Sequence, residues 1–343
     1  MLRLPCGPVL CCALTLAACA ASPNVQKPPA GADGAWALAI HGGAGTLDRN
    51  APEAQLQAYR ASLQQALTLG RDRLARGDAA LDVCEAVVRM MEDDPLFNAG
   101  RGAALNEAGQ HELDASIMDG STMACGAVAG VTTVKNPISL ARKVMEQTTH
   151  ILLAGSGAEA FATAVGVERV PNEWFTTERR KQMLEEELKA RTRTGAMPAA
   201  SKGALGAGTF GTVGCVARDR AGRLAAATST GGMTAKKPGR IGDSPIVGAG
   251  NYADRWAAVS GTGTGEQFIR HTIARTISAR MQFGGESLEQ AAHAAIMQTL
   301  NPGDGGIIAV DGAGKIVAVY NSEGMYRGLA DSAGRFEVRI FEQ

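Results

Sequence analysis

The chain has 343 residues, of which 45% are hydrophobic and 20% are charged, and Lys plus Arg equals Asp plus Glu at 34 each. A chain of this length can bury a large core, and its balanced charge argues against nucleic acid or an anionic membrane surface as a partner. The 43 glycines gather in short motifs, which indicates tight turns and close backbone approach. We therefore expect a globular body of the size of an enzyme.

The N-terminus is expected to lie outside that body. Residues 1–18 resemble a signal peptide, because the positively charged Arg3 is followed by the apolar run Val9 to Leu16. This run is too short to span a bilayer as a helix of the mature protein. The segment Leu16-Ala17-Ala18-Cys19 resembles a bacterial lipobox and predicts a lipid anchor on Cys19, with ordinary secretory cleavage as the alternative. Ala20, rather than aspartate, follows the cysteine, and by resemblance to lipoprotein sorting rules this favours a periplasmic protein anchored to the outer membrane. Residues 19–34, rich in Ala, Pro and Gly, then read as a flexible tether.

The first half of the body alternates strands and helices. Strand 36–40 ends in His41-Gly42-Gly43-Ala44-Gly45, and apolar residues recur at helical spacing in residues 56–67 and 81–91. A further strand is expected at residues 126–131, followed by helices starting near Pro137 and Ala158. Cys84 and Cys215 read as small core residues, and no cysteine spacing is typical of a metal site.

Residues 173–211 differ in composition from the rest of the body. Charged clusters are followed by a run of small residues that ends at Gly208, and no apolar face persists through its last part. We predict a mobile surface linker there.

Two hairpins and two helices are predicted after this linker. Turn residues 219–222 separate strands 212–217 and 224–228, and turn residues 311–314 separate strands 307–310 and 316–320. The helices, over 268–277 and 288–300, lie between the hairpins in the sequence. Strands and helices in both halves of the chain predict stacked sheets covered by helices.

The junction Gly211-Thr212 carries the strongest chemical signal. If this peptide bond breaks, the Thr212 hydroxyl lies beside its own free α-amine, which titrates near pH 7 to 8 and can act as its base. Gly211 has no Cβ in the path of attack on its carbonyl and permits a strained backbone. An isolated Gly-Thr pair would instead be an ordinary start of a strand.

Eight segments in the same order resemble the isoaspartyl peptidases of the plant-type L-asparaginase family, which are N-terminal nucleophile hydrolases. The matching segments are residues 41–45, 97–102, 114–120, 211–214, 228–234, 239–245, 261–266 and 323–328. The resemblance implies a four-layer αββα sandwich, an α+β fold, with residues 35–343 as one catalytic domain. It also implies cleavage into residues 35–211 and 212–343, and a homodimer of cleaved protomers.

The same resemblance assigns roles to individual residues. It implies that Thr212 is the nucleophile, that Thr230 orients it and that Asn98 contacts its α-amine. The Thr262 hydroxyl and the Gly263 N–H would bind the oxyanion. For the substrate, the resemblance implies that Arg240 holds the α-carboxylate as a bidentate fork and that Asp243 pairs with the α-ammonium. Without it, Arg240 and Asp243 would read as a solvated surface pair.

The expected substrates are small: isoaspartyl dipeptides and asparagine. The resemblance implies no catalytic cofactor, but it does imply a structural sodium ion held by backbone carbonyls of the loop Met91 to Arg101. Of the histidines, His41 is expected to be structural, and none lies in a motif with a serine or cysteine nucleophile. Asp114 and Asp119 are expected to pack near the site.

Departures from the family pattern leave alternatives. Gly261 stands where many relatives have cysteine, and Ala235-Lys236-Lys237 differs from the usual run, so the shape of the site is expected to differ. A glycosylasparaginase would typically have aspartate directly before the threonine, where this chain has Gly211. A lipoprotein that binds amino acids or peptides without catalysis is the rival from another class. The sequence does not rank asparagine against isoaspartyl peptides.

Overall fold

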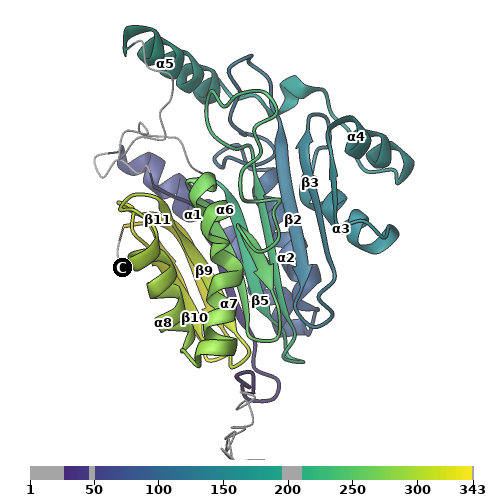
Figure 1. Ribbon diagram of the computed structural model, residues 1–343, viewed down its shortest axis with the longest axis vertical. Helices are drawn as coiled ribbons and strands as arrows, with labels where there is room; N and C mark the ends of the chain where they lie inside the picture. The colour runs from purple at the N-terminus through teal and green to yellow at the C-terminus, as the bar shows by residue number, and fades with distance from the viewer. Residues whose placement is uncertain (1–26, 46–50, 195–210, 342–343) are drawn as a thin grey trace, which may run out of the picture.

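The computed structural model describes residues 27–45, 51–194 and 211–341, and two β-sheets form its centre (Figure 1). The larger sheet consists, in spatial order, of β12 (Phe336–Arg339), β11 (Met325–Asp331), β1 (Ala37–Ala44), β5 (Val213–Arg218), β6 (Leu224–Thr230), β2 (Leu113–Asp119), β3 (Cys125–Val131) and β4 (Leu152–Ala154). The smaller consists of β10 (Ile316–Tyr320), β9 (Gly305–Asp311), β8 (Ala257–Gly263) and β7 (Asn251–Ala253). Neighbouring strands pair antiparallel except β3 with β4.

Both predicted hairpins are confirmed, as β5–β6 and β9–β10. Each turn is closed by an aspartate whose side chain accepts backbone N–H groups. Asp219 Oδ1 accepts from Ala221 at 2.9 Å, and Asp311 Oδ1 accepts from Ala313 at 2.9 Å. The aspartate therefore supplies the local hydrogen bonds that fix where each hairpin reverses.

Helices cover both sheets. The helices of the described residues are α1 (Glu53–Arg76), α2 (Ala80–Glu92), α3 (Pro137–Gln147), α4 (Gly155–Ala164), α5 (Glu178–Thr194), α6 (Gly265–His271), α7 (Ile273–Gly284) and α8 (Leu288–His293), with a 3₁₀ turn at Asn172–Phe175 and a π-helical turn at Ala294–Thr299. Of these, α5 projects away from the sheets (Figure 1). In Figure 1, α7 and α8 lie on the side of β9 and β10, and α1 and α2 lie behind the larger sheet.

The alternation of side chains along β1 separates two hydrophobic cores. Leu38 and Ile40 pack with α1 and α2, whereas Ala37 and Ala39 pack with the smaller sheet and with α7 and α8. Successive residues of a strand point to opposite faces, so one strand serves both cores. The alanines on the inner face let the two sheets approach closely. The structure thus shows a mixed α/β protein in which two sheets stack and helices cover the outer faces.

Two predicted helices are interrupted. The helix predicted over 268–277 is divided by Thr272, which has φ of 44° and is exposed, into α6 and α7. The one predicted over 288–300 begins with the capping box of Ser287 and Gln290 and ends in the π-helical turn. Apolar spacing marked the buried face in both cases, but spacing alone does not detect a single left-handed residue.

Helix α5 lies within the predicted linker 173–211, so the first half of that segment is regular structure and the prediction missed it. The buried Arg180 guanidinium of this helix donates to the Gly102 carbonyl, and Arg191 Nη1 donates to the Ala235 carbonyl at 3.0 Å. The helix is held by these polar contacts rather than by an apolar face. Residues 195–210, the rest of the predicted linker, lie outside the described residues.

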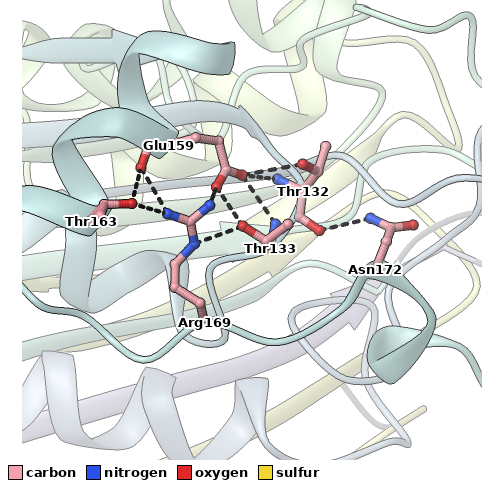
Figure 2. Close-up of polar contacts among 6 residues, drawn as sticks. All are labelled: Thr132, Thr133, Glu159, Thr163, Arg169 and Asn172. Carbon is pink, nitrogen blue, oxygen red and sulfur yellow. Dashed lines mark hydrogen bonds and ion pairs between the residues drawn. The ribbon is translucent and has the colours of Figure 1, made fainter.

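A polar cluster fixes the edge of the larger sheet around α4 (Figure 2). Glu159 Oε1 accepts the backbone N–H of Thr132 at 2.5 Å and of Thr133 at 3.0 Å, and its other oxygen pairs with Arg169. Asn172 Nδ2 donates to the Thr132 carbonyl at 2.8 Å and to the His111 carbonyl at 2.9 Å. A carboxylate accepting several N–H groups orders a loop strongly, so this cluster anchors the segment after β3.

Residues 1–18, Cys19 and the tether up to residue 26 lie outside the described residues. Among the helices that the structure describes, none combines the length and the apolar character needed to cross a membrane.

Candidate active site

Thr212 lies directly before β5, in the middle of the larger sheet. It shares with Gly214 and Val216 the face of β5 that looks toward the smaller sheet, because these residues alternate along the strand. The Thr212 hydroxyl donates to Thr230 Oγ1 at 3.1 Å, and Thr230 Oγ1 also accepts the Gly232 N–H at 3.0 Å. Both threonines are buried. The antiparallel pairing of β5 with β6 therefore joins the two hydroxyls predicted to act together.

The peptide bond before Thr212 is held in a confined place. The Asn98 N–H donates to the Gly211 carbonyl oxygen at 3.0 Å. A Cβ on Gly211 would lie 2.8 Å from Asn98 Cβ, and one on Gly43 would lie 2.6 Å from Gly211 Cα. The absence of both Cβ atoms lets the end of β1, the loop that contains Asn98 and the segment before β5 meet at this bond. The N–H of Asn98 is a donor aimed at the carbonyl on which negative charge would develop during attack.

Asn98 is engaged by its side chain as well. Its Nδ2 donates to the Gly232 carbonyl at 2.7 Å, and its Oδ1 accepts the Ala104 N–H at 2.6 Å. The resemblance implied a contact between Asn98 and the α-amine of Thr212. In the uncleaved chain the residue instead reaches Gly211 through its backbone, and its amide joins the loop after α2 to the end of β6.

His41, on β1, contacts Thr212, the predicted nucleophile. Its Nδ1 lies 3.0 Å from the Thr212 carbonyl oxygen, and its Nε2 lies 2.8 Å from Ser260 Oγ. Burial lowers the pKa of His41 to about 3, even though the bond to the Thr212 carbonyl raises it. The imidazole is therefore neutral at physiological pH and both of its nitrogens are occupied. This supports the prediction that His41 is not the base, but the sequence did not reveal its contact with Thr212.

The predicted oxyanion donors, Thr262 and Gly263, end β8, one of the two inner strands of the smaller sheet. Thr262 Oγ1 accepts the Ala44 N–H at 3.2 Å, so its own proton remains available to another acceptor. Gly263 has φ of 153° and packs so closely on the Asp304 carbonyl that a Cβ would overlap it. Glycine is required at this position by both backbone conformation and space.

Arg240 and Asp243 approach each other at Gly265. A Cβ on Gly265 would lie 2.9 Å from Arg240 Nη2 and 2.9 Å from Asp243 Oδ1. Gly265 follows Gly263 by two residues, so one short segment joins the predicted substrate clamp to the predicted oxyanion donors. The Arg240 guanidinium meanwhile forms a fork with Glu266, with Nε–Oε1 and Nη2–Oε2 distances of 2.9 Å each.

The charges of this clamp are shifted by burial. Burial raises the pKa of Asp243 to about 7, although the Arg240 charge lowers it, and Asp243 Oδ2 has no hydrogen-bond partner among the described residues. Burial also acts to raise the pKa of Glu266, but the bonds from Arg240 bring it below its ordinary value. Asp243 is thus an acceptor that lacks a donor, beside a guanidinium already paired with another carboxylate.

Two further buried charges lie beside the clamp. The Lys236 ammonium donates to the Glu112 carbonyl at 2.8 Å, and burial lowers its pKa. Burial raises the pKa of Asp114, whose Oδ2 has no partner in the described part of the chain. Asp119 does not lie near the site as predicted: it ends β2 opposite Ala225, whereas Asp114 pairs with Thr230 at the other end of the strand. Its side chain accepts from Ser121 and Thr122 in the turn that follows. Lys236 belongs to the run that departs from the family pattern, and its burial was not predicted.

The loop predicted to bind sodium offers backbone oxygens. The carbonyl oxygen of Phe97 would lie 2.7 Å from a Cβ on Gly102, and the Pro95 carbonyl points at the same position. Carbonyl oxygens are the ligands that hard cations prefer, so the donor type fits. No group of three or more His, Cys, Asp and Glu side chains is placed to hold a metal ion in residues 27–45, 51–194 and 211–341.

Comparisons with known proteins show the family to which the chain belongs. The class of protein is a hydrolase with a mixed α/β fold: a family model described as "Asparaginase" matches residues 34–340, and the chain belongs to that family. It is 50% identical to "Isoaspartyl peptidase" of Salmonella typhimurium, over 84% of this chain and 93% of the relative. It is 48% identical to "Isoaspartyl peptidase" of Escherichia coli, over 84% and 91%.

A plant relative covers more of the chain. "Probable isoaspartyl peptidase/L-asparaginase 2" of Arabidopsis thaliana is 46% identical, over 90% of this chain and all of the relative. The resemblance inferred from eight short segments is thereby confirmed at the level of the family.

Proposed function

We propose that this protein is an isoaspartyl peptidase with L-asparaginase activity, which hydrolyses the amide on the β-carboxyl of an aspartyl unit. The observation that carries the proposal is the junction itself: the Thr212 hydroxyl is bonded to Thr230, while the Gly211 carbonyl accepts the Asn98 N–H. The nucleophile and a polarised carbonyl are adjacent in one chain. The names of the relatives support this substrate class.

Maturation starts from that junction. Thr212 Oγ1 attacks the Gly211 carbonyl carbon while Thr230 Oγ1 orients the attacking hydroxyl. The Asn98 N–H stabilises the oxyanion. Collapse of the intermediate breaks the C–N bond, and the hydroxyl proton passes to the departing nitrogen, so that Thr212 gains a free α-amine and Oγ1 carries the acyl group as an ester. Water then hydrolyses the ester, which leaves residue 211 as a carboxylate and restores the Thr212 hydroxyl.

Turnover uses the new chain end. The neutral α-amine takes the proton of Thr212 Oγ1, which attacks the β-carbonyl of the substrate. The Thr262 hydroxyl and the Gly263 N–H stabilise the oxyanion, and the departing nitrogen leaves as ammonia or as a peptide amine. Water hydrolyses the acyl-enzyme and releases aspartate. No cofactor takes part in these steps.

The clamp selects the aspartyl head. The α-carboxylate of the substrate replaces Glu266 on the Arg240 fork, because both are carboxylates that suit bidentate pairing. The α-ammonium supplies the donor that Asp243 Oδ2 lacks. A substrate must carry both groups to satisfy both residues, which favours free asparagine and isoaspartyl units at an N-terminus.

Several finer expectations belong to the same proposal. The stacked sheets with outer helices would be the αββα sandwich of N-terminal nucleophile hydrolases, and cleaved protomers would pair as a homodimer. Sodium would be held by carbonyls of the loop from Met91 to Arg101.

A lipid on Cys19 would tether the enzyme to the outer membrane. Fractionation checks that point: the wild-type protein should be in the membrane fraction, and Cys19→Ser should release it.

Gel analysis and product release test the proposed function together. Purified wild-type protein should separate into two chains on a denaturing gel, with Thr212 as the new N-terminus, and should release aspartate from β-aspartyl dipeptides and ammonia from asparagine. Glycosylated asparagine, the substrate of the alternative amidase, should be a poor substrate. A persistent single chain that releases neither product would instead support the binding lipoprotein.

A further inference from the structure

A row of buried hydrogen bonds runs from the smaller sheet to the nucleophile residue. Ser260 Oγ on β8 lies 2.8 Å from His41 Nε2 and 2.7 Å from Thr228 Oγ1, and His41 Nδ1 lies 3.0 Å from the Thr212 carbonyl oxygen. His41, Ser260 and Thr228 are fully buried. The mechanism above uses none of these three side chains.

The chemistry of the groups fixes the direction of each bond. A carbonyl oxygen only accepts, so His41 Nδ1 carries the proton and donates to Thr212. Neutral His41 then has a bare Nε2, which accepts the Ser260 proton. Ser260 Oγ therefore accepts the hydroxyl proton of Thr228. Of the hydrogen bonds that Thr228 Oγ1 makes, the one to Ser260 is the shortest. One assignment of donors and acceptors therefore accounts for all three bonds: Thr228 donates to Ser260, Ser260 donates to His41, and His41 donates to the Thr212 carbonyl.

Asn251 continues the row at its far end. The Asn251 amide lies 3.4 Å from Thr228 Oγ1 through Oδ1, and its Nδ2 is a buried donor without a partner in the described residues. Turning this amide by about 180° would place Nδ2 as the donor to Thr228. The Asn251 amide would then donate to Thr228 Oγ1, in the same direction as the other bonds of the row.

Glycine at position 214 leaves the space for this row. A Cβ on Gly214 would overlap both Ser260 Oγ and His41 Nε2. His41 lies opposite Gly214 in the β1–β5 pairing, so its ring crosses the strand over this glycine to reach Thr212. The arrangement needs a side chain that bridges two strands, rather than one that only fills the core.

We propose that His41, oriented by Ser260 and Thr228, is a positioning residue that holds the Thr212 carbonyl in register for catalysis. The inference rests on the proposed function, and deepens it. Cleavage removes the covalent restraint on the N-terminal side of Thr212, so its position then depends on the rest of its contacts. A fixed carbonyl orients the Cα of Thr212, and with it both the α-amine and Oγ1 that must act together.

Two variants separate this role from simple filling of the core. In His41→Asn, the side-chain amide nitrogen takes about the position of Nδ1 and can still donate to the Thr212 carbonyl. In His41→Gln, the amide nitrogen takes about the position of Nε2 instead, so the bond to the Thr212 carbonyl is lost. On matured protein, with the cleaved fraction measured by gel, we expect His41→Asn to keep kcat within about threefold. His41→Gln should lose about 30- to 100-fold in kcat with KM almost unchanged, since misplacement by about 1 Å costs this much.

The outcomes distinguish the proposal from the function on which it rests. Equal losses of kcat in both variants, or a rise in KM alone, would overturn the positioning role while leaving the hydrolase intact. A wild-type protein that releases no product would remove the proposed function. Even in that case, nitrogen-15 spectra of the wild-type histidines test the hydrogen-bond arrangement. His41 should be the Nδ1–H tautomer throughout pH 5 to 8, and an Nε2–H tautomer would refute the proposed bond from His41 to Thr212.

Discussion

The proposed nucleophile, Thr212, and the proposed substrate clamp, Arg240 and Asp243, differ in how complete their hydrogen bonds are in the absence of substrate. Around Thr212, the hydroxyl and the carbonyl oxygen both have partners at 3.0 to 3.1 Å, supplied by Thr230 and His41. In the clamp, Asp243 Oδ2 has no partner within the described residues, and Arg240 is paired with a carboxylate of the protein itself.

This difference shows two ways of preparing a site. Thr212 is held in place in advance, and if it is the nucleophile this spares the reaction the cost of ordering it in each turnover. In the proposed clamp, Asp243 Oδ2 gains a hydrogen-bond donor only when a substrate that carries an ammonium and a carboxylate binds. Changes on the nucleophile side should therefore affect kcat and maturation, whereas changes in the clamp should affect KM and the pH dependence.

The largest effect is expected from Thr212→Ala. Without the hydroxyl, neither the Gly211 carbonyl nor a substrate can be attacked, so the chain should stay whole and activity should fall by about 10⁴-fold or more. The matched control is Thr212→Ser, which keeps both the hydroxyl and the future α-amine and should still split. Cleavage of the alanine variant at Gly211, seen by mass spectrometry, would assign maturation to another group.

Arg240→Gln should come next. The substrate α-carboxylate would lose a bidentate charged partner, and kcat/KM should fall by about 10³-fold, mostly through KM. Arg240→Lys keeps the charge but not the fork, and should lose about 10- to 100-fold. If kcat fell alone while KM stayed constant, the division between nucleophile and clamp would be wrong.

Asp243 gives a pH dependence. Its pKa of about 7 means that the carboxyl becomes an anion, able to pair with the substrate ammonium, only as the pH rises through 7. In the free enzyme, kcat/KM should therefore rise across that range. Asp243→Asn should lower kcat/KM, and the pH dependence that remains should be that of the Thr212 α-amine alone. A profile unchanged by Asp243→Asn would exclude this residue as the titrating group.

The same shift predicts a change in stability of known sign. The folded-state pKa lies above the ordinary 3.8, so folding is favoured while the carboxyl is protonated, and this contribution is lost as the pH rises through about 7. Asp243→Asn should therefore raise the melting temperature relative to wild type at pH 8 more than at pH 5. Calorimetry at the two pH values checks this.

Glu266→Gln is expected to have the smallest effect. The Glu266 side chain is 45% exposed, and exposed ion pairs are weak, so removing the competitor for Arg240 should lower KM by only about two- to threefold. Glu289→Gln, which breaks an exposed pair with Lys315, is the matched control and should leave KM unchanged. A large rise in KM for Glu266→Gln would mean that Glu266 holds Arg240 in place.

Much of the fold could be predicted because its signals are local. Alternation, turn residues and helical spacing predicted β1, both hairpins, α1 and α2. The same rules missed the break at Thr272, which depends on a single residue with positive φ, and α5, which packs through arginines rather than through an apolar face.

By itself, the sequence determined the family, the Gly211-Thr212 junction and the residue types of the clamp, because those signals lie within short segments. Tertiary structure alone decided what each group touches. It brought His41 to the Thr212 carbonyl across 171 positions, aimed the Asn98 backbone at Gly211 and buried Asp243 so that its pKa rose. Spacing along a chain does not encode distance in space or local dielectric, and both follow only from packing the two sheets together.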